Sequence, residues 1–220
     1  MTASLSIDIW SDVVCPWCYI GKRRFEVALE RVRAAAPDLH IDIRYRAYQL
    51  DPSAPPGGSM PAREAYARKF GGEERADQII GHVTRIAADS GIEFRMDRAI
   101  RANTMLAHRA LHRVLTTRGS ADQAALKEEL LRAYFTDGQN VGDIDVVVAC
   151  AERAGLDAGD LREWLDTDGS VAEVVADIEA AQIRDITGVP AFVIDDRFLI
   201  PGAQEVDVFE QLLMRALNTR

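Results

Sequence analysis

The first part of the chain alternates between two kinds of hydrophobic pattern. Apolar residues occupy every second position over residues 5–9, and Trp10 follows on the opposite face, which is typical of a strand buried on both sides. Over residues 21–36 the apolar positions recur at steps of three and four, which predicts an amphipathic helix ended by Pro37. Strict alternation returns over residues 41–47. The pattern therefore predicts a strand, a helix and a second strand, joined by a right-handed crossover.

Helical spacing replaces the strand pattern in the middle of the chain. We expect helices near residues 61–70, 74–90, 97–118, 121–136, 143–154 and 159–166. Ser120 with Gln123 predicts a capping box at the start of one of these helices. Ser170 with Glu173 predicts another, ahead of a further helix that runs to about Arg184.

Two short runs rich in Val, Ile and Phe return near the end of the chain. They are separated by Asp195 and Asp196 and predict an antiparallel hairpin, and a helix from about Glu205 to Leu217 follows. Terminal strand segments of this length bury too little apolar area to fold separately. The pattern therefore predicts one α/β domain that carries a long helical insertion.

The cysteine pair in Cys15-Pro16-Trp17-Cys18 stands where the first strand gives way to the helix. Proline suits the first helical position, so we expect Cys15 at or near the N-cap. A thiolate there faces unpaired backbone N–H groups and the positive end of the helix dipole, and we expect both to lower the pKa of Cys15. Cys18 lies one helical turn further on, within disulfide distance. The pair therefore predicts a redox centre with an oxidising disulfide.

The sequence gives weaker signals for a metal site and for other reactive residues. A zinc site built on the cysteine pair would need a second ligand pair at short spacing, which the sequence lacks, so we expect no metal. Cys150 lies in a helical pattern, where a lone cysteine packs as a small hydrophobe. His108 and His112 share a helical face without a glutamate partner, which favours packing over metal binding. For the basic residues 22–24, we favour a solvated helix face.

The charge and composition of the chain argue against some classes of binding partner. The chain has 35 acidic and 26 basic residues and a formal net charge of -9, so we expect neither nucleic acid nor a membrane surface as a partner. The first residues lack a basic leader region, and no stretch is apolar for long enough to span a bilayer. Three cysteines are too few for a disulfide scaffold. These features predict a cytoplasmic protein in which a close cysteine pair is catalytic.

Longer motifs surround and extend beyond the cysteine pair: SDVVCPWCYIGKRRFE, AYQLDP, NTMLAHRALHRV, AYFTDGQNVGD and ITGVPAFVID. Together they resemble the DsbA-like branch of the thioredoxin superfamily, and most closely its FrnE-like group, over nearly the whole chain. The resemblance implies a thioredoxin-like fold with a large all-helical insertion. Residues 1–57 and 168–220 would form the thioredoxin-like domain, and residues 58–167 the insertion.

The resemblance also assigns roles to residues. It implies that Cys15 is the attacking thiol and Cys18 the resolving thiol, and that Pro190 is a cis-proline whose loop faces the disulfide. Val189 would then offer its backbone to a bound substrate. The implied activity is thiol–disulfide exchange, with a redox-active Cys15–Cys18 disulfide and no other cofactor.

Five further residues are candidates at the same site. By the resemblance, Asn103 and His108 border the groove and contact substrate, whereas Trp17 is expected to be an exposed substrate contact on its own chemistry. Asp12 or Asp8 could accept the proton of Cys18. We favour the plainer interpretation, in which Asp12 is solvated or capping and Asp8 is partly exposed on its strand.

Two rival functions stay open. Kappa-class glutathione transferases and 2-hydroxychromene-2-carboxylate isomerases resemble the same fold, and they predict a glutathione-dependent enzyme acting on a small molecule. Those relatives carry a single serine or cysteine where this chain has both Cys15 and Cys18. A redox-regulated binding or chaperone module is the third interpretation. The sequence also leaves the substrate open, which is a thiol or disulfide on a protein or a small molecule. It does not decide the direction of exchange, or whether the protein is a homodimer or has another oligomeric state.

Overall fold

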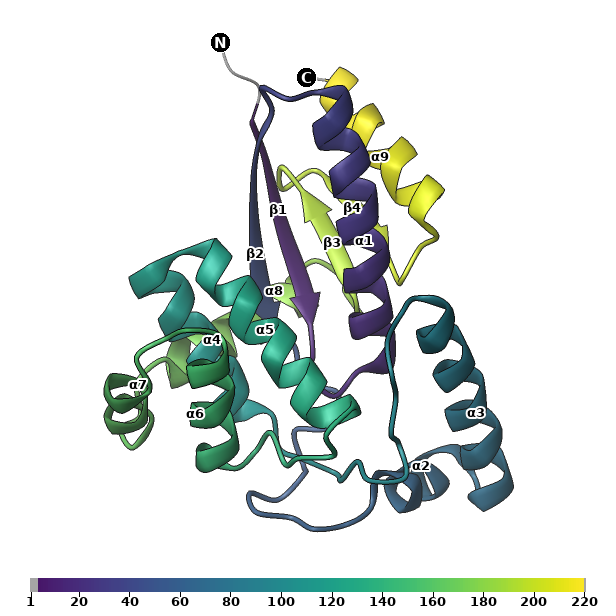
Figure 1. The fold of residues 1–220 in the computed structure, drawn as a ribbon, viewed down its shortest axis with the longest axis vertical. Coiled ribbons are helices and arrows are strands. Elements are labelled where there is room, and N and C mark those ends of the chain that lie inside the picture. Colours follow the sequence, from purple (N-terminus) through teal and green to yellow (C-terminus); the bar gives the residue numbers. More distant parts are fainter. Residues whose placement is uncertain (1–3, 220) are drawn as a thin grey trace.

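A four-stranded sheet organises the computed structural model, which describes residues 4–219 (Figure 1). β1 (Ser4–Ser11) pairs in parallel with β2 (His40–Ala47), and the strand order is β2-β1-β3-β4. β3 (Ala191–Ile194) runs antiparallel to both β1 and β4 (Phe198–Pro201). The sheet confirms the predicted strand, helix and strand at the start of the chain and the predicted hairpin near its end.

The helices account for most of the remaining chain. They are α1 (Pro16–Ala35), α2 (Ala62–Phe70), α3 (Glu73–Asp89), α4 (Met105–Arg118), α5 (Ser120–Phe135), α6 (Ile144–Arg153), α7 (Ala158–Leu165), α8 (Val171–Ile183) and α9 (Val206–Asn218). Helices α2 to α7 fall between β2 and α8, where the helical pattern predicts an insertion. Within residues 4–219, none of the helices combines the length and the apolar character that a bilayer crossing requires.

Different helices cover the two faces of the sheet. α1 lies beside α9 over one face (Figure 1), and the rings of Phe25, Phe192 and Phe209 meet there with centroids 4.8 to 5.4 Å apart. On the opposite face, Trp10 packs with Ala181 of α8. Because β1 is buried on both faces, the residues that follow it are held firmly at one end of the sheet.

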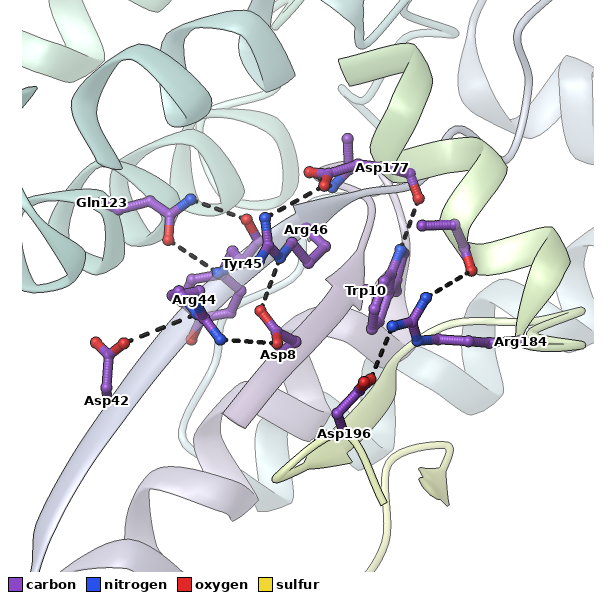
Figure 2. A network of polar contacts seen from close by, with 12 residues as sticks. Asp8, Trp10, Asp42, Arg44, Tyr45, Arg46, Gln123, Asp177, Arg184 and Asp196 are labelled. Carbon is purple, nitrogen blue, oxygen red and sulfur yellow. Dashed lines mark hydrogen bonds and ion pairs between the residues drawn. The ribbon is translucent and has the colours of Figure 1, made fainter. Parts of the chain in front are cut away.

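The edge strand β2 is closed by side chains from two helices, as Figure 2 shows. The side-chain amide of Gln123 on α5 accepts from the backbone N–H of Tyr45 and donates to its carbonyl, both at 2.8 Å. Asp177 on α8 accepts from the N–H of Ala47 at 3.1 Å, and its backbone carbonyl accepts from the Trp10 indole at 2.8 Å. These contacts satisfy backbone groups that an edge strand leaves unpaired, and they fix α5 and α8 against the sheet.

One predicted helix begins later than its pattern suggested. The helix expected over residues 97–118 starts at Met105, because residues 98–101 lie in a connection that forms a bridge between Pro61 and Ile100. Backbone pairing across the chain has outweighed the local helical spacing of these residues.

The two predicted capping boxes are also wrong. Ser120 is the first residue of α5 and not its N-cap, and the Gln123 side chain is bonded to β2. Ser170 precedes α8 in a left-handed conformation (φ 56°) and makes no side-chain cap bond. Side-chain caps of this kind are present at Asp143 and Asp157, which accept from backbone N–H groups at the starts of α6 and α7.

Candidate redox site

Cys15 and Cys18 lie at the junction of β1 and α1. Cys15 is the N-cap of α1, with φ -91° and ψ 116°, and Pro16 is the first helical residue, as predicted. The N–H of Cys18 donates to the carbonyl of Cys15 at 3.0 Å, which closes the first turn. Both side chains are free thiols, each 3% exposed. The strand therefore delivers Cys15 to the helix start, and the helix places Cys18 one turn behind it.

The loop before β3 faces the cysteine pair. The peptide bond between Val189 and Pro190 is cis, and the Cys15 sulfur lies 3.6 Å from the carbonyl oxygen of Val189. Gly21 on α1 allows this approach, because a Cβ at that position would lie 3.0 Å from Cγ of Pro190 and 3.2 Å from Cβ of Ala203. The structure thus places the proline loop where the family resemblance implied it.

The two thiols ionise as a pair. The hydrogen bond between Cys15 and Cys18, and then burial, raise the pKa of Cys15 well above its ordinary value, and the charge of Asp12 adds to this effect. Burial alone would also raise the pKa of Cys18. The hydrogen bond from Cys15 and the positive charge of Lys127 outweigh burial and bring the pKa of Cys18 below its ordinary value. Of the two thiols, Cys18 is therefore the more readily ionised.

The prediction that the helix start lowers the pKa of Cys15 is accordingly wrong for the reduced pair. The backbone N–H of Cys18 does favour a Cys15 thiolate, as helix geometry requires. The second thiol is closer and dominates, because a proton shared between two sulfurs can leave only one of them charged.

Asp12 lies in the loop that leads to Cys15 and is fully buried, so the solvated interpretation of this residue is wrong. One carboxylate oxygen accepts from the N–H of Val13 at 2.8 Å and lies 3.1 Å from Nε2 of His108. The other accepts from the N–H of Leu50 at 2.8 Å. These contacts tie the cysteine loop to α4 and to the segment after β2.

Lys127 of α5 is a candidate functional residue that sequence reasoning missed. Its side chain is buried, and its Nζ lies 5.6 Å from the ring centroid of Tyr45. Burial lowers the pKa of Lys127 to about 8, although the charges of Cys18 and Asp12 oppose the shift. The sequence carries a signal for this burial, because Lys127 lies at helical spacing with other buried residues of α5: Gln123, Leu130, Leu131 and Tyr134.

A cavity of about 670 Å³ adjoins Cys15. Its wall is formed by the start of α1, by α2 and α3, and by the loop at Val189, and it includes the rings of Tyr66 and Tyr134. Cys15 lines the cavity, whereas Cys18 is not among its lining residues. A substrate in the cavity therefore meets the sulfur of Cys15 first.

The structure brings only some of the predicted site residues to this cavity. Val189 and Trp17 line it, but Trp17 is half-buried against His82 and is not an exposed contact. Asn103 lies outside the cavity wall, where its side chain donates to a backbone carbonyl at 2.7 Å and accepts from a backbone N–H at 3.0 Å. His108 is buried beneath the site, bonded to Asp12. Neither His108 nor Asn103 is placed to touch a substrate in this cavity.

Asp8 belongs to a different network, on the α8 face of the sheet (Figure 2). Its carboxylate pairs with Arg44 at 3.0 Å and with Arg46 at 2.7 Å. Asp8 is partly exposed on its strand, as the plainer interpretation held. The structure therefore gives Asp8 ion-pair partners and brings Asp12, but not Asp8, to the cysteine loop.

Three other predictions from the sequence concern residues outside the cavity wall. The basic residues 22–24 are not a solvated face: Lys22 is buried and paired with Glu26 and Glu128, and the other two also form ion pairs. Cys150 is fully buried on α6, as expected of a small hydrophobe. His112 contacts the hydroxyl of Ser170 at 2.6 Å. Among residues 4–219, no group of three or more His, Cys, Asp or Glu side chains is arranged to hold a metal ion.

Comparisons with known proteins show which family the chain belongs to. A family model described as a DSBA-like thioredoxin domain matches residues 6–214. Among solved structures, the chain is similar to a probable DsbA oxidoreductase, SCO1869, from Streptomyces coelicolor, with 33% identity and a TM-score of 0.86. That similarity covers 98% of this chain and 91% of the other.

Two further structures share the fold at lower identity. The cytosolic disulfide reductase DsbM from Pseudomonas aeruginosa has a TM-score of 0.67 and 18% identity, covering 98% of this chain and 100% of the other. A 2-hydroxychromene-2-carboxylate isomerase has a TM-score of 0.68 and 16% identity, covering 97% of each chain. On the family match, and in agreement with its motifs, this chain belongs to the DSBA-like thioredoxin domain family.

Proposed function

We propose that this chain is a thiol–disulfide oxidoreductase that works through Cys15 and Cys18. The observation that carries the proposal is their arrangement: two thiols one turn apart at a helix start, of which Cys15 lines the cavity and Cys18 does not. The Cys15 thiolate attacks a substrate disulfide and releases one substrate thiol, leaving a mixed disulfide. The Cys18 thiolate then attacks the Cys15 sulfur and releases the second thiol. The substrate gains two electrons, and the pair becomes a disulfide.

The attacking thiolate arises within the pair. Of the two thiols in the reduced pair, Cys18 is the more readily ionised. Transfer of a proton from Cys15 to Cys18 places the charge on Cys15, where the N–H of Cys18 stabilises it. No separate base is needed for the first step, because Cys18 itself takes the proton.

The cavity indicates which thiols and disulfides fit. Cys15 is nearly buried, so a substrate must enter the space between α1, α2 and the Val189 loop to reach it. A small molecule or an extended peptide segment with apolar groups suits the aromatic and aliphatic wall. We place the reaction in the cytoplasm, by analogy with the cytosolic disulfide reductase DsbM, and require no cofactor beyond the Cys15–Cys18 disulfide.

A second candidate function is a glutathione-dependent isomerase or transferase. It is favoured by the largely apolar cavity beside Cys15, which has room for a small molecule, and by the isomerase that shares this fold. In that mechanism glutathione supplies the reacting thiol, and Cys18 has no chemical step. The two candidates therefore differ in what they require of Cys18.

Trapping separates these candidates. We expect a Cys18→Ser variant, incubated with oxidised glutathione or with insulin, to accumulate a mixed disulfide at Cys15 and to lose multiple turnover, because nothing resolves the intermediate. A Cys15→Ser variant is the matched control and should accumulate none. If Cys18→Ser retains full turnover of a substrate that the wild type processes, the one-thiol mechanism replaces the dithiol one.

A further inference from the structure

Lys127 occupies a place that folding stability does not explain. A buried ammonium group ordinarily has a partner, because an unpaired charge in the interior is costly. Lys22 obeys this rule, since its Nζ lies 2.6 Å from carboxylate oxygens of both Glu26 and Glu128. Lys127 is 1% exposed, and its Nζ has no hydrogen-bond partner among residues 4–219. An interior charge kept without a hydrogen bond or an ion pair points to a role outside folding.

The charges around Lys127 converge on the cysteine pair. The groups that favour its charged form are Cys18 first, then Asp12 and Cys15, whereas Lys22 opposes it. Reciprocally, Lys127 has the largest effect on Cys18 of any charged side chain. The structure brings the two neighbourhoods together, since Tyr19, next to Cys18, donates its hydroxyl to Glu128, next to Lys127, at 2.7 Å.

The charged groups on the elements around α5 have partners of their own. From α1, Lys22 opposes the charge of Lys127 but is paired with Glu26 and Glu128. From β2, Tyr45 presents only its ring to Lys127, at 5.6 Å. From α4, the titratable group nearest the site is His108, which is bonded to Asp12. From α6, Cys150 and Arg153 contact Glu129.

The second step of exchange is where Lys127 matters most. In the reduced pair, the hydrogen bond from Cys15 is the largest effect that favours a Cys18 thiolate, and Lys127 is the next. Once Cys15 has joined a substrate sulfur, it has no S–H to donate. The Cys18 thiolate then depends on Lys127, with smaller help from the side chain of Ser11.

We propose that Lys127 is a positioning residue that holds a positive charge near Cys18 and so speeds resolution of the mixed disulfide. The inference rests on the proposed dithiol function. In this step Cys18 loses its proton and its sulfur attacks that of Cys15. The bond between Cys15 and the substrate sulfur breaks, and the departing thiolate takes up a proton. Lys127 keeps its own protons and stabilises the charge on Cys18.

Single-turnover kinetics with dithiobis(nitrobenzoate) test this. Attack by Cys15 releases the first coloured thiolate, and resolution by Cys18 releases the second, so the two steps are seen separately. We expect Lys127→Met to slow the second release about three- to tenfold at pH 7 and to move its pH midpoint up by about one unit, because removing the positive charge disfavours the Cys18 thiolate. The first release should change less, and Lys127→Arg should retain most of the wild-type rate.

Two controls keep the proposal falsifiable. Lys22→Met removes another buried lysine, whose charge is already balanced by two carboxylates, and should leave the pH midpoint of the second release unchanged. Lys127→Met should unfold at the same or a higher temperature than the wild type, because an unpaired buried charge is lost. The proposal is overturned if Lys127→Met slows both releases equally without moving the midpoint. A wild type that gives no second release would instead refute the dithiol function itself.

Discussion

Cys150 and the Cys15–Cys18 pair are all buried, but their surroundings differ. Cys150 lies inside α6 with its sulfur 3.6 Å from the carbonyl of Glu129. Burial raises its pKa to about 11, and the nearby Arg153 offsets this only in part. The pair lies at a helix start, beside a cavity and a second sulfur. Burial alone therefore makes a thiol inert, and reactivity comes from what stabilises its charge.

The comparison also shows how the charge is divided within a reactive pair. Cys15 has access to the cavity, but in the reduced pair Cys18 has the lower pKa. Access to the cavity and ease of ionisation therefore belong to different cysteines. In the proposed mechanism, Lys127 favours the charge on Cys18, which does not line the cavity.

The largest expected effect is the loss of Cys15. We expect Cys15→Ser to reduce disulfide exchange at least about a thousandfold, because the hydroxyl cannot form the mixed disulfide. Cys150→Ser is the matched change at a thiol that our account leaves without a role. Reduction of insulin, followed by turbidity, measures both. Equal loss in the two variants would remove the distinction between the pair and Cys150.

Alkylation against pH gives the next largest contrast. Because burial raises the pKa of Cys150 to about 11 from an ordinary 9.0, its thiolate fraction at pH 7 is about a hundredfold lower than that of an ordinary thiol. The pair, with a lowered pKa at Cys18, begins to ionise below the ordinary range. Mass spectrometry after brief iodoacetamide treatment should show the pair labelled at neutral pH and Cys150 labelled only near pH 11. Faster labelling of Cys150 than of the pair at pH 7 would contradict the comparison.

A moderate effect is expected at the cavity wall. Trp17→Ala should lower kcat/KM about tenfold for substrates with apolar groups, because it removes part of the wall next to Cys15. Trp164 on α7 is the control, since it packs in the helical insertion and not in the cavity wall. Its replacement by alanine should lower the unfolding temperature while KM stays near the wild-type value. If kcat/KM falls equally for apolar and polar substrates, Trp17 does not recognise the apolar groups of the substrate.

The smallest effect is expected at Asp8. Asp8→Asn weakens the ion pairs with Arg44 and Arg46 and should cost about 1 kcal/mol of unfolding free energy. Exchange rates and the pH dependence of exchange should not change, because this network lies on the α8 face of the sheet (Figure 2). Denaturant unfolding and the insulin assay together measure both quantities. A shifted pH profile would restore the hypothesis that Asp8 relays protons.

Much of the fold was predictable because its signals are local. Alternating and helical spacing identified β1, α1 and β2, the final hairpin and most helices, and Pro16 located Cys15 at the N-cap. The helix expected from residue 97 was wrong, because residues around Ile100 pair with Pro61 across the chain. Such pairing depends on residues distant in sequence, which periodicity does not report.

The site was predictable only in its cysteines, Pro190 and the residues beside them. The contact between Asp12 and His108 joins positions 96 apart, and Lys127 reaches the pair from the helical insertion. Sequence spacing cannot show either relation, although Lys127 lies at helical spacing with other buried residues of α5, a signal that our predictions did not use. The pKa of Cys15 was misjudged for a related reason: the helix-dipole argument treats one thiol, whereas two thiols share one proton here.

The most direct test of the dithiol account is disulfide mapping of the oxidised protein. After incubation with oxidised glutathione, proteolysis and mass spectrometry should find one intramolecular disulfide between Cys15 and Cys18, with Cys150 as a free thiol, and dithiothreitol should reverse the bond. A protein that keeps all three thiols, or that links either member of the pair to Cys150, would contradict the account.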